Sequence, residues 1–217
     1  MSRFRVRRFI SGGETRCVQA TFRMAVETFT GTDPGEAYAD ELTGYVEGRG
    51  TWQFRMLLAL ADLGLNAIDH ERLDIDKFVV DPEGAIRDQA QDEQAIRLIL
   101  DETDLESETA AARACIDSTR LQFVNSIPSM QDLIEQVSLG RLVMCNVDLQ
   151  VLERKPEREG HILLVEEIDD LSVVAHDPGP HGKLCRQFDR DLFERAWRSP
   201  SPAMANLISV WQDAPGS

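Results

Sequence analysis

A cysteine, a histidine and an aspartate occur in this sequence in an order that can assemble a thiol nucleophile, its base and an orienting carboxylate. Cys17 stands early in the chain, His161 begins a much later apolar run, and Asp177 directly precedes Pro178. In such a trio the histidine takes the proton of the cysteine and later returns it to a leaving group, while the carboxylate holds the imidazole in one tautomer. The set therefore predicts nucleophilic acyl chemistry, provided that the fold brings the three side chains together.

Cys17 is expected at the start of a helix. Residues 17–29 carry an apolar stripe at helical spacing, and the glycine at position 31 ends the pattern. A cysteine at a helix N-terminus faces unpaired backbone N–H groups and the positive end of the helix dipole, both of which favour the thiolate. The alternative is a small buried residue at a helix start, which from spacing alone is the more frequent case.

His161 and Asp177 are expected on neighbouring strands, at residues 161–168 and 171–176 with an acidic turn between them. Because side chains alternate along a strand, a two-residue loop would pair His161 with Pro178 and place Asp177 on the opposite face. A three-residue loop would set His161 opposite Asp177. The catalytic interpretation therefore requires an odd loop or a β-bulge. Taken singly, His161 could be a strand-end residue and Asp177 a turn residue, and only the trio favours catalysis.

Composition limits the classes of partner. The 217 residues, 42% of them hydrophobic, suffice for one domain with a real interior. The formal charge of −15 disfavours nucleic acid and anionic lipid and favours a cationic partner or substrate. The one basic cluster alternates with apolar residues and predicts a solvated strand face over residues 3–10. Because we find neither an apolar stretch long enough to cross a bilayer nor a secretory signal, we expect a cytoplasmic protein with no membrane partner.

The four cysteines are expected to be reduced thiols rather than a disulfide framework, with Cys115 and Cys145 as packing residues. A zinc site formed by His176, His181 and Cys185 is an alternative to the catalytic interpretation. It lacks a paired C-x-x-C element, and the glycines and prolines around it predict a loop whose histidines can face water. No metal site is therefore expected.

Helical patterns dominate the first part of the chain and strand patterns the last. We predict further helices over residues 50–63 and 129–139 and a short helix over residues 190–197. Strands are predicted in the final third, at residues 141–151, 161–168, 171–176 and 203–211. Residues 82–118 predict two helices joined near Asp104, a helical insertion. This order indicates an α+β protein, with the active site between its two layers. We expect one domain, residues 1–217, in which a helical lobe (about 11–139) packs on an antiparallel sheet lobe (about 140–213).

These elements resemble the C39-like branch of the papain-like cysteine peptidases, from the strand before Cys17 to the last strand near Trp211. The resemblance rests on the Cys17 helix, on Ser-Met-Gln-Asp-Leu-Ile at 129–134, on Gly-His-Ile-Leu-Leu-Val at 160–165 and on Val-Val-Ala-His-Asp-Pro at 173–178. It implies the papain-like fold, a triad of Cys17, His161 and Asp177, acyl-enzyme chemistry on a peptide or amide bond, and no cofactor. The substrate would be a peptide or protein, and the chain's acidity favours a cationic one.

Two departures from that family concern the oxyanion. The family commonly follows its cysteine with Gly-Pro-Ala, where this chain has Val-Gln-Ala, and commonly has a glutamine six residues earlier, where this chain has Ser11. Loss of one oxyanion donor typically costs about a hundred- to a thousandfold in rate. Ser11, Thr15 and Gln19 are the candidate replacements. The alternatives are a weak or inactive C39-like module that binds a peptide or protein partner, and a thiol acyltransferase.

Overall fold

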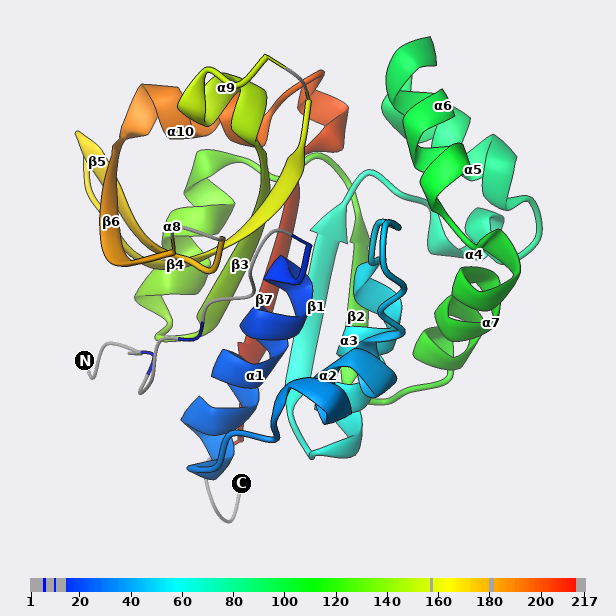
Figure 1. Ribbon diagram of the computed structural model, residues 1–217, viewed down its shortest axis with the longest axis horizontal. Coiled ribbons are helices and arrows are strands. Elements are labelled where there is room, and N and C mark those ends of the chain that lie inside the picture. Colours follow the sequence, from blue (N-terminus) through cyan, green and yellow to red (C-terminus); the bar gives the residue numbers. More distant parts are fainter. Residues whose placement is uncertain (1–5, 7–9, 11–14, 157, 180–181, 214–217) are drawn as a thin grey trace.

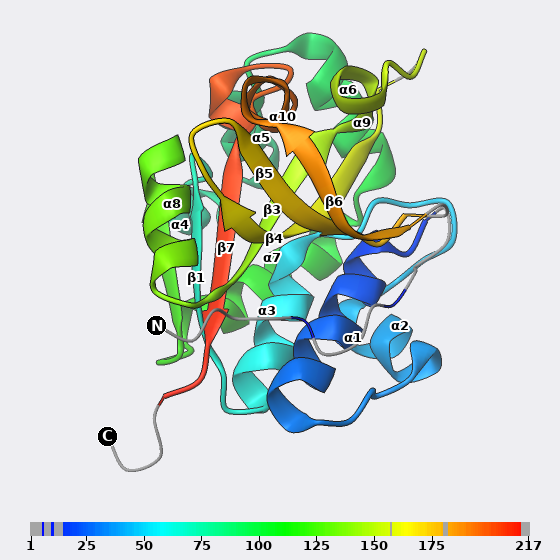
Figure 2. The same cartoon turned by 90° about the vertical axis from the view of Figure 1, so that its left-hand side faces the viewer.

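The protein is an α+β structure with helices on both faces of one open sheet (Figures 1 and 2). The computed structural model describes residues 6, 10, 15–156, 158–179 and 182–213, and these form ten α-helices, one short 3-10 helix and seven strands. The strands are β1 (Asn66–Glu71), β2 (Leu121–Asn125), β3 (Leu142–Asp148), β4 (Gly160–Ile168), β5 (Ser172–Asp177), β6 (Lys183–Asp189) and β7 (Asn206–Trp211). Their order is β2-β1-β7-β3-β4-β5-β6, and β1–β2 is the parallel pair in a sheet that is otherwise antiparallel.

Seven of the ten helices in the described residues precede β2 and three follow it. The bounds of the first seven are α1 (Cys17–Thr30), α2 (Glu36–Thr43), α3 (Gln53–Asp62), α4 (Ile75–Phe78), α5 (Pro82–Ala90), α6 (Glu93–Glu102) and α7 (Leu105–Ile116). The remaining three are α8 (Met130–Ser138), α9 (Leu149–Glu153) and α10 (Arg190–Trp197). None of the helices in the described ranges combines the length and the apolar character needed to cross a bilayer.

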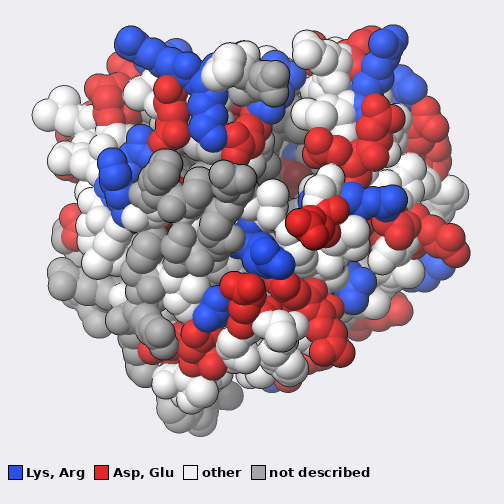
Figure 3. All heavy atoms as spheres, viewed as in Figure 1, with Lys and Arg blue, Asp and Glu red and all other residues white. Residues whose placement is uncertain are grey.

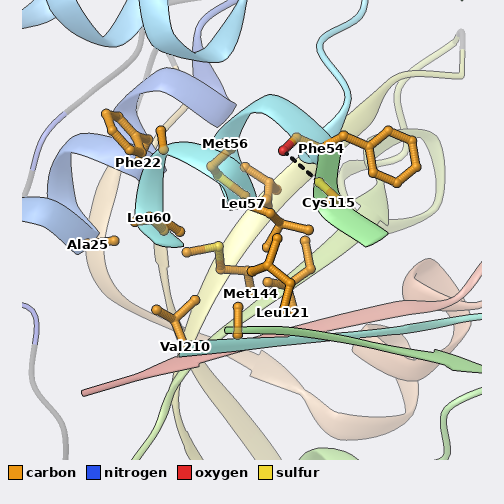
Figure 4. Packing of buried hydrophobic residues seen from close by; sticks show 14 of the residues in the cluster. Phe22, Ala25, Phe54, Met56, Leu57, Leu60, Cys115, Leu121, Met144 and Val210 are labelled. Atoms are coloured by element: carbon orange, nitrogen blue, oxygen red, sulfur yellow. Dashed lines mark hydrogen bonds between the residues drawn. The ribbon is translucent and has the colours of Figure 1, made fainter. Parts of the chain in front are cut away.

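Strand β3 divides the interior into two cores because its side chains alternate between the faces of the sheet. Leu142 and Met144 join the core under α1, α3 and α7, which Figure 4 shows from close by. Val143, Cys145 and Val147 join the second core, which includes the apolar side of α10. Both faces of β3 are thus buried, and the strand is an anchor for the elements on either side.

Helix α1 is held by the first core and carries Cys17 at its first position. Phe22, Met24 and Ala25 are fully buried, so the helix is hydrophobic on a wide face. The helix ends at Gly31, which adopts a left-handed conformation (φ 81°) that a glycine tolerates without strain. Packing therefore fixes both the position and the direction of α1.

Several predicted elements are confirmed. The helices that begin at Cys17, within residues 50–63, after Ser129 and at Arg190 are present, and Ser129 caps α8 through its hydroxyl. The strands near 142, 161, 172 and 206 are present as well. The predicted strand at residues 3–10 lies mostly outside the described residues.

The sheet and the insertion differ from the prediction. The predicted helical range 11–139 contributes two strands, β1 and β2, to the sheet, which is therefore mixed rather than purely antiparallel. Residues 82–118 form three helices instead of two, because Asp92 and Asp104 each cap a new helix start. Cys185, which was expected in a loop around residues 179–182, lies on β6 at the sheet edge.

Replacing Leu60 by alanine tests the first core. Leu60 is fully buried in α3, whereas Leu63, just after the same helix, is 39% exposed. We expect Leu60→Ala to lower the free energy of unfolding by about 2–5 kcal/mol, because it removes buried methyl groups and leaves a cavity. Leu63→Ala is the matched control, expected to cost less than about 1 kcal/mol. Equal losses in urea unfolding would contradict this core assignment.

Candidate active site

Cys17 lies at the N-terminus of α1 and borders a pocket of about 470 Å³. The side chain is half-buried, and no side-chain oxygen caps the first turn of the helix. The first N–H groups of a helix have no acceptor within it, so they carry partial positive charge beside the sulfur. The fold therefore places the Cys17 thiol at a helix N-terminus, which favours the thiolate, and beside a pocket that a ligand can enter.

A β-bulge puts His161 and Asp177 on one face of the sheet. Next to the turn, which spans residues 169–172, Ile168 pairs with Val173. The register then shifts between Val165 and Glu167, so that Leu164 pairs with His176. One further step along both strands sets Asp177 opposite Leu163, two positions from His161 and thus on its face. The predicted need for an odd loop or a bulge is met by the bulge, and not by a three-residue loop.

The three side chains form a connected chain of hydrogen bonds. Nε2 of His161 donates to Oδ1 of Asp177 at 2.7 Å, and both side chains are buried. Cys17 shares a side-chain hydrogen bond with His161. Because Nε2 is engaged by the carboxylate, Nδ1 is the ring nitrogen left for the thiol. The structure thus brings together the cysteine, histidine and aspartate that the sequence singled out.

The electrostatics of this group favour a thiolate beside an imidazolium. Burial raises the pKa of Cys17, but the hydrogen bond and charge of His161 outweigh burial and the net pKa is lowered. Burial likewise lowers the pKa of His161, and its hydrogen bonds to Asp177 and Cys17 reverse this and raise the pKa to about 9. At neutral pH the proton therefore resides on His161.

Asp177 is held as a carboxylate by three donors. Burial alone would raise its pKa, but His161, the Gly179 N–H and Arg186 lower it well below the ordinary range. Gly179 N–H donates to Oδ1 at 3.0 Å, and Nη1 of Arg186 donates to Oδ2 at 2.8 Å. A Cβ at position 179 would lie 3.1 Å from Oδ1 of Asp177 and 3.3 Å from Cε1 of His161, so a side chain there would push against both groups of the site.

Arg186 and Gly179 are site residues that the sequence analysis missed. Arg186 lies on β6, pairs also with Glu153, and places its guanidinium 4.6 Å from the ring centroid of Phe188. The strand was missed because glycines and prolines before it predicted a loop. The alternation of Arg186 with Phe188 is the signal that could have revealed the strand.

The candidate oxyanion donors are placed differently from the expectation. Ser11 lies outside the described residues. Thr15 borders the pocket, and its hydroxyl is hydrogen-bonded to that of Tyr45 at 2.8 Å. Gln19 is buried and its amide nitrogen donates to Thr43 and to Thr51, at 2.8 and 3.3 Å, so it is not aimed at the sulfur. The first backbone N–H groups of α1 have no acceptor within the helix, so they are the remaining candidate donors to an oxyanion.

His176 and Cys185, two members of the alternative zinc set, do lie close together, with Glu166 in place of His181, which is outside the described residues. The ligand atoms of the three lie within 4.8 Å of one another. The Cys185 N–H donates to Nδ1 of His176 at 3.2 Å, so the neutral imidazole carries its hydrogen on Nε2, which faces Glu166 at 3.3 Å. In this tautomer His176 offers no lone pair to a metal, and the cluster fits a hydrogen-bonded group better.

Cys115 and Cys145 are fully buried in the two cores, as expected of packing residues. Burial raises the pKa of Cys115 to about 12 and also raises that of Cys145. Their thiols are protonated at neutral pH and contrast with that of Cys17.

The comparisons with known proteins do not assign a family. Neither a scan against protein-family models nor a search of curated proteins finds a match for this chain. The evidence for a function is therefore the geometry of Cys17, His161 and Asp177.

Replacing Arg186 by methionine tests whether the guanidinium positions the site. A hydrogen bond to a charged group is worth about 1.5–3 kcal/mol. Without it we expect Asp177 to hold His161 less firmly and the rate of Cys17 alkylation by iodoacetamide at pH 6 to fall about three- to tenfold. Arg190→Met, which removes an ion pair to the exposed Asp170, is the control. An unchanged rate in folded Arg186→Met would contradict the positioning role.

Proposed function

We propose that this protein is a cysteine-dependent hydrolase of papain-like, C39-like architecture that cleaves a peptide or amide bond through an acyl-enzyme on Cys17. The observation that carries the proposal is a buried imidazole, His161, hydrogen-bonded on one side to Asp177 and on the other to a thiol at a helix N-terminus. Nucleophile, base and orienting group in this order are the parts that thiol-dependent acyl transfer requires.

The first half of the reaction forms the acyl-enzyme. The Cys17 thiolate attacks the carbonyl carbon of the scissile amide and a C–S bond forms, while the carbonyl oxygen takes up the negative charge. The start of α1 supplies backbone N–H groups toward that charge. His161 then gives its Nδ1 proton to the leaving nitrogen as the C–N bond breaks, and an amine departs.

The second half releases the acid. His161, now neutral, accepts a proton from water as the water oxygen attacks the thioester carbon. Collapse of the intermediate breaks the C–S bond, returns a carboxylic acid to solution and restores the thiolate–imidazolium pair. Throughout both halves Asp177 stays ionised and keeps the imidazole in one orientation, since Gly179 and Arg186 hold its two oxygens.

A binding module of low or no activity is the second candidate, and the placement of Gln19 favours it. The amide of Gln19 is committed to Thr43 and Thr51, so it does not supply the side-chain donor that related peptidases use. Loss of one such donor reduces rate by about a hundred- to a thousandfold. An acyltransferase would share the same acyl-enzyme and differ in using an amine instead of water as the acceptor.

Alkylation of the four cysteines of one protein tests thiol activation with internal controls. Because the pKa of Cys17 is lowered and those of Cys115 and Cys145 are raised, we expect iodoacetamide at pH 6 to modify Cys17 first. The exposed Cys185, which lies on β6 and not at a helix N-terminus, should react more slowly than Cys17 at pH 6. Peptide mass spectrometry resolves the sites. In His161→Ala, Cys17 should lose its reactivity at pH 6; if it keeps that reactivity, the imidazole does not activate it.

Turnover is tested by replacing the nucleophile. Cys17→Ala should abolish amide hydrolysis, measured with a library of fluorogenic peptide amides, with little change in thermal unfolding. Cys185→Ala is the control and should keep wild-type rates. Comparable hydrolysis in Cys17→Ala would refute the mechanism. A wild-type Cys17 that is reactive at pH 6 without turnover of any library member would favour the binding module.

A further inference from the structure

The pocket beside Cys17 reaches a buried glutamate. Glu71 lines the pocket, and both of its oxygens accept from amides, Oε1 from Gln53 at 2.6 Å and Oε2 from Gln89 at 2.9 Å. The same Gln53 amide lies 3.2 Å from Oδ2 of Asp69, which is two residues away on β1 and therefore on the same face. Two carboxyl groups are thus held side by side by neutral donors.

This pair of carboxyl groups has no cationic partner in the described part of the chain. Neither Asp69 nor Glu71 forms an ion pair there, and Oδ1 of Asp69 is buried with no hydrogen-bond partner. Burial raises the pKa of both groups, to about 7 for Asp69, and the charge of Asp69 adds to the rise at Glu71. A buried pair of this kind retains a proton unless a cation replaces it.

The walls of the pocket are largely apolar, and the helical insertion forms one of them. Trp52, Met56 and Met204 contribute apolar surface, as do Leu98 and Ile99 of α6. These residues come from two separate parts of the chain, because α6 belongs to the helical insertion and Met204 lies just before β7. The apolar part of a ligand can therefore lie between α6 and the sheet.

The charged residues that line the pocket are mostly acidic. Besides Glu71 they include Glu102, Asp148 and Glu159, against two arginines, Arg49 and Arg158. Arg158 is engaged by Asp148 at 3.3 Å and by Asp92 at 3.6 Å. Acidic side chains also gather over the insertion helices on the face seen in Figure 3. The field at the pocket therefore attracts cations rather than anions.

We propose that this pocket is a specificity site for a substrate with a cationic group on an apolar stem, and that Glu71 receives the ammonium or guanidinium. The inference rests on the proposed function in so far as the scissile carbonyl lies at Cys17, which lines the same pocket. Glu71 is a specificity-determining residue here and takes no part in bond breaking. In this proposal α6 of the helical insertion forms the wall against which the apolar stem of the substrate packs.

Binding is tested in Cys17→Ala, so that no reaction intervenes. Isothermal titration calorimetry compares phenethylammonium with 2-phenylethanol and 3-phenylpropionate, three probes with similar apolar stems and different charge. We expect phenethylammonium to bind at least tenfold more tightly than either of the others. Adding Glu71→Gln should reduce this preference about tenfold. Adding Glu83→Gln, on the exposed side of α5 and paired with Arg87, should leave it unchanged.

If Glu71→Gln fails to fold, the comparison of the three probes in Cys17→Ala still tests the inference. Equal affinities for the three probes, or a cation preference that survives in folded Glu71→Gln, would overturn the inference. In the wild type, phenethylammonium should also slow alkylation of Cys17, and binding without protection would overturn the placement of the cation in the pocket of the thiol. A Cys17 that proves inactive toward amides while the charge preference holds would refute the hydrolase and leave the cation site intact.

Discussion

The buried hydrogen bond between His161 and Asp177 is the interaction on which the candidate site depends. Removing an aspartate and a histidine from water is costly, and the arrangement is stable only if the remaining polar atoms are satisfied. Asp177 meets this condition through the Gly179 N–H and Arg186. The imidazole meets it through Cys17. The thiol is therefore part of the network that makes the buried pair tolerable, and its ionisation follows from the same contacts.

The fold enforces this network from two directions. On one side, the first core fixes α1 and hence the position of Cys17. On the other, β4 is paired on both edges, with β3 and with β5, so that His161 has little freedom to shift. The bulge after Val165 then brings Asp177 to the correct face. Bulges next to functional sites commonly re-aim a side chain in this way.

The sequence predicted the parts of the site that depend on local patterns. Helical periodicity placed Cys17 at a helix start, and strand alternation showed that His161 and Asp177 could meet only with an odd loop or a bulge. The position of that bulge depends on how β4 and β5 pair with their other neighbours, and no local pattern encodes it. The glycines and prolines before β6 concealed this strand, and with it Arg186, which supports Asp177 from the strand next to β5.

Strand β1 was not predicted from the sequence because acidic residues that lie near the pocket interrupt its apolar pattern. Its buried face carries Ala67, Asp69 and Glu71, so two of the three residues that point inward are acidic where an alternating strand is expected to be apolar. Glu71 of this acidic pair also lines the pocket and adds to its acidic character. Departures from the expected pattern are most informative at such places.

The most direct test of the account is an NMR titration of the His161 imidazole in the wild type and in Cys17→Ala. The account predicts that His161 titrates near pH 9 in the wild type, because the thiolate and Asp177 both stabilise its charge, and that its pKa falls when the thiol is removed. A wild-type pKa close to the ordinary value of about 6.5, unchanged in Cys17→Ala, would contradict it.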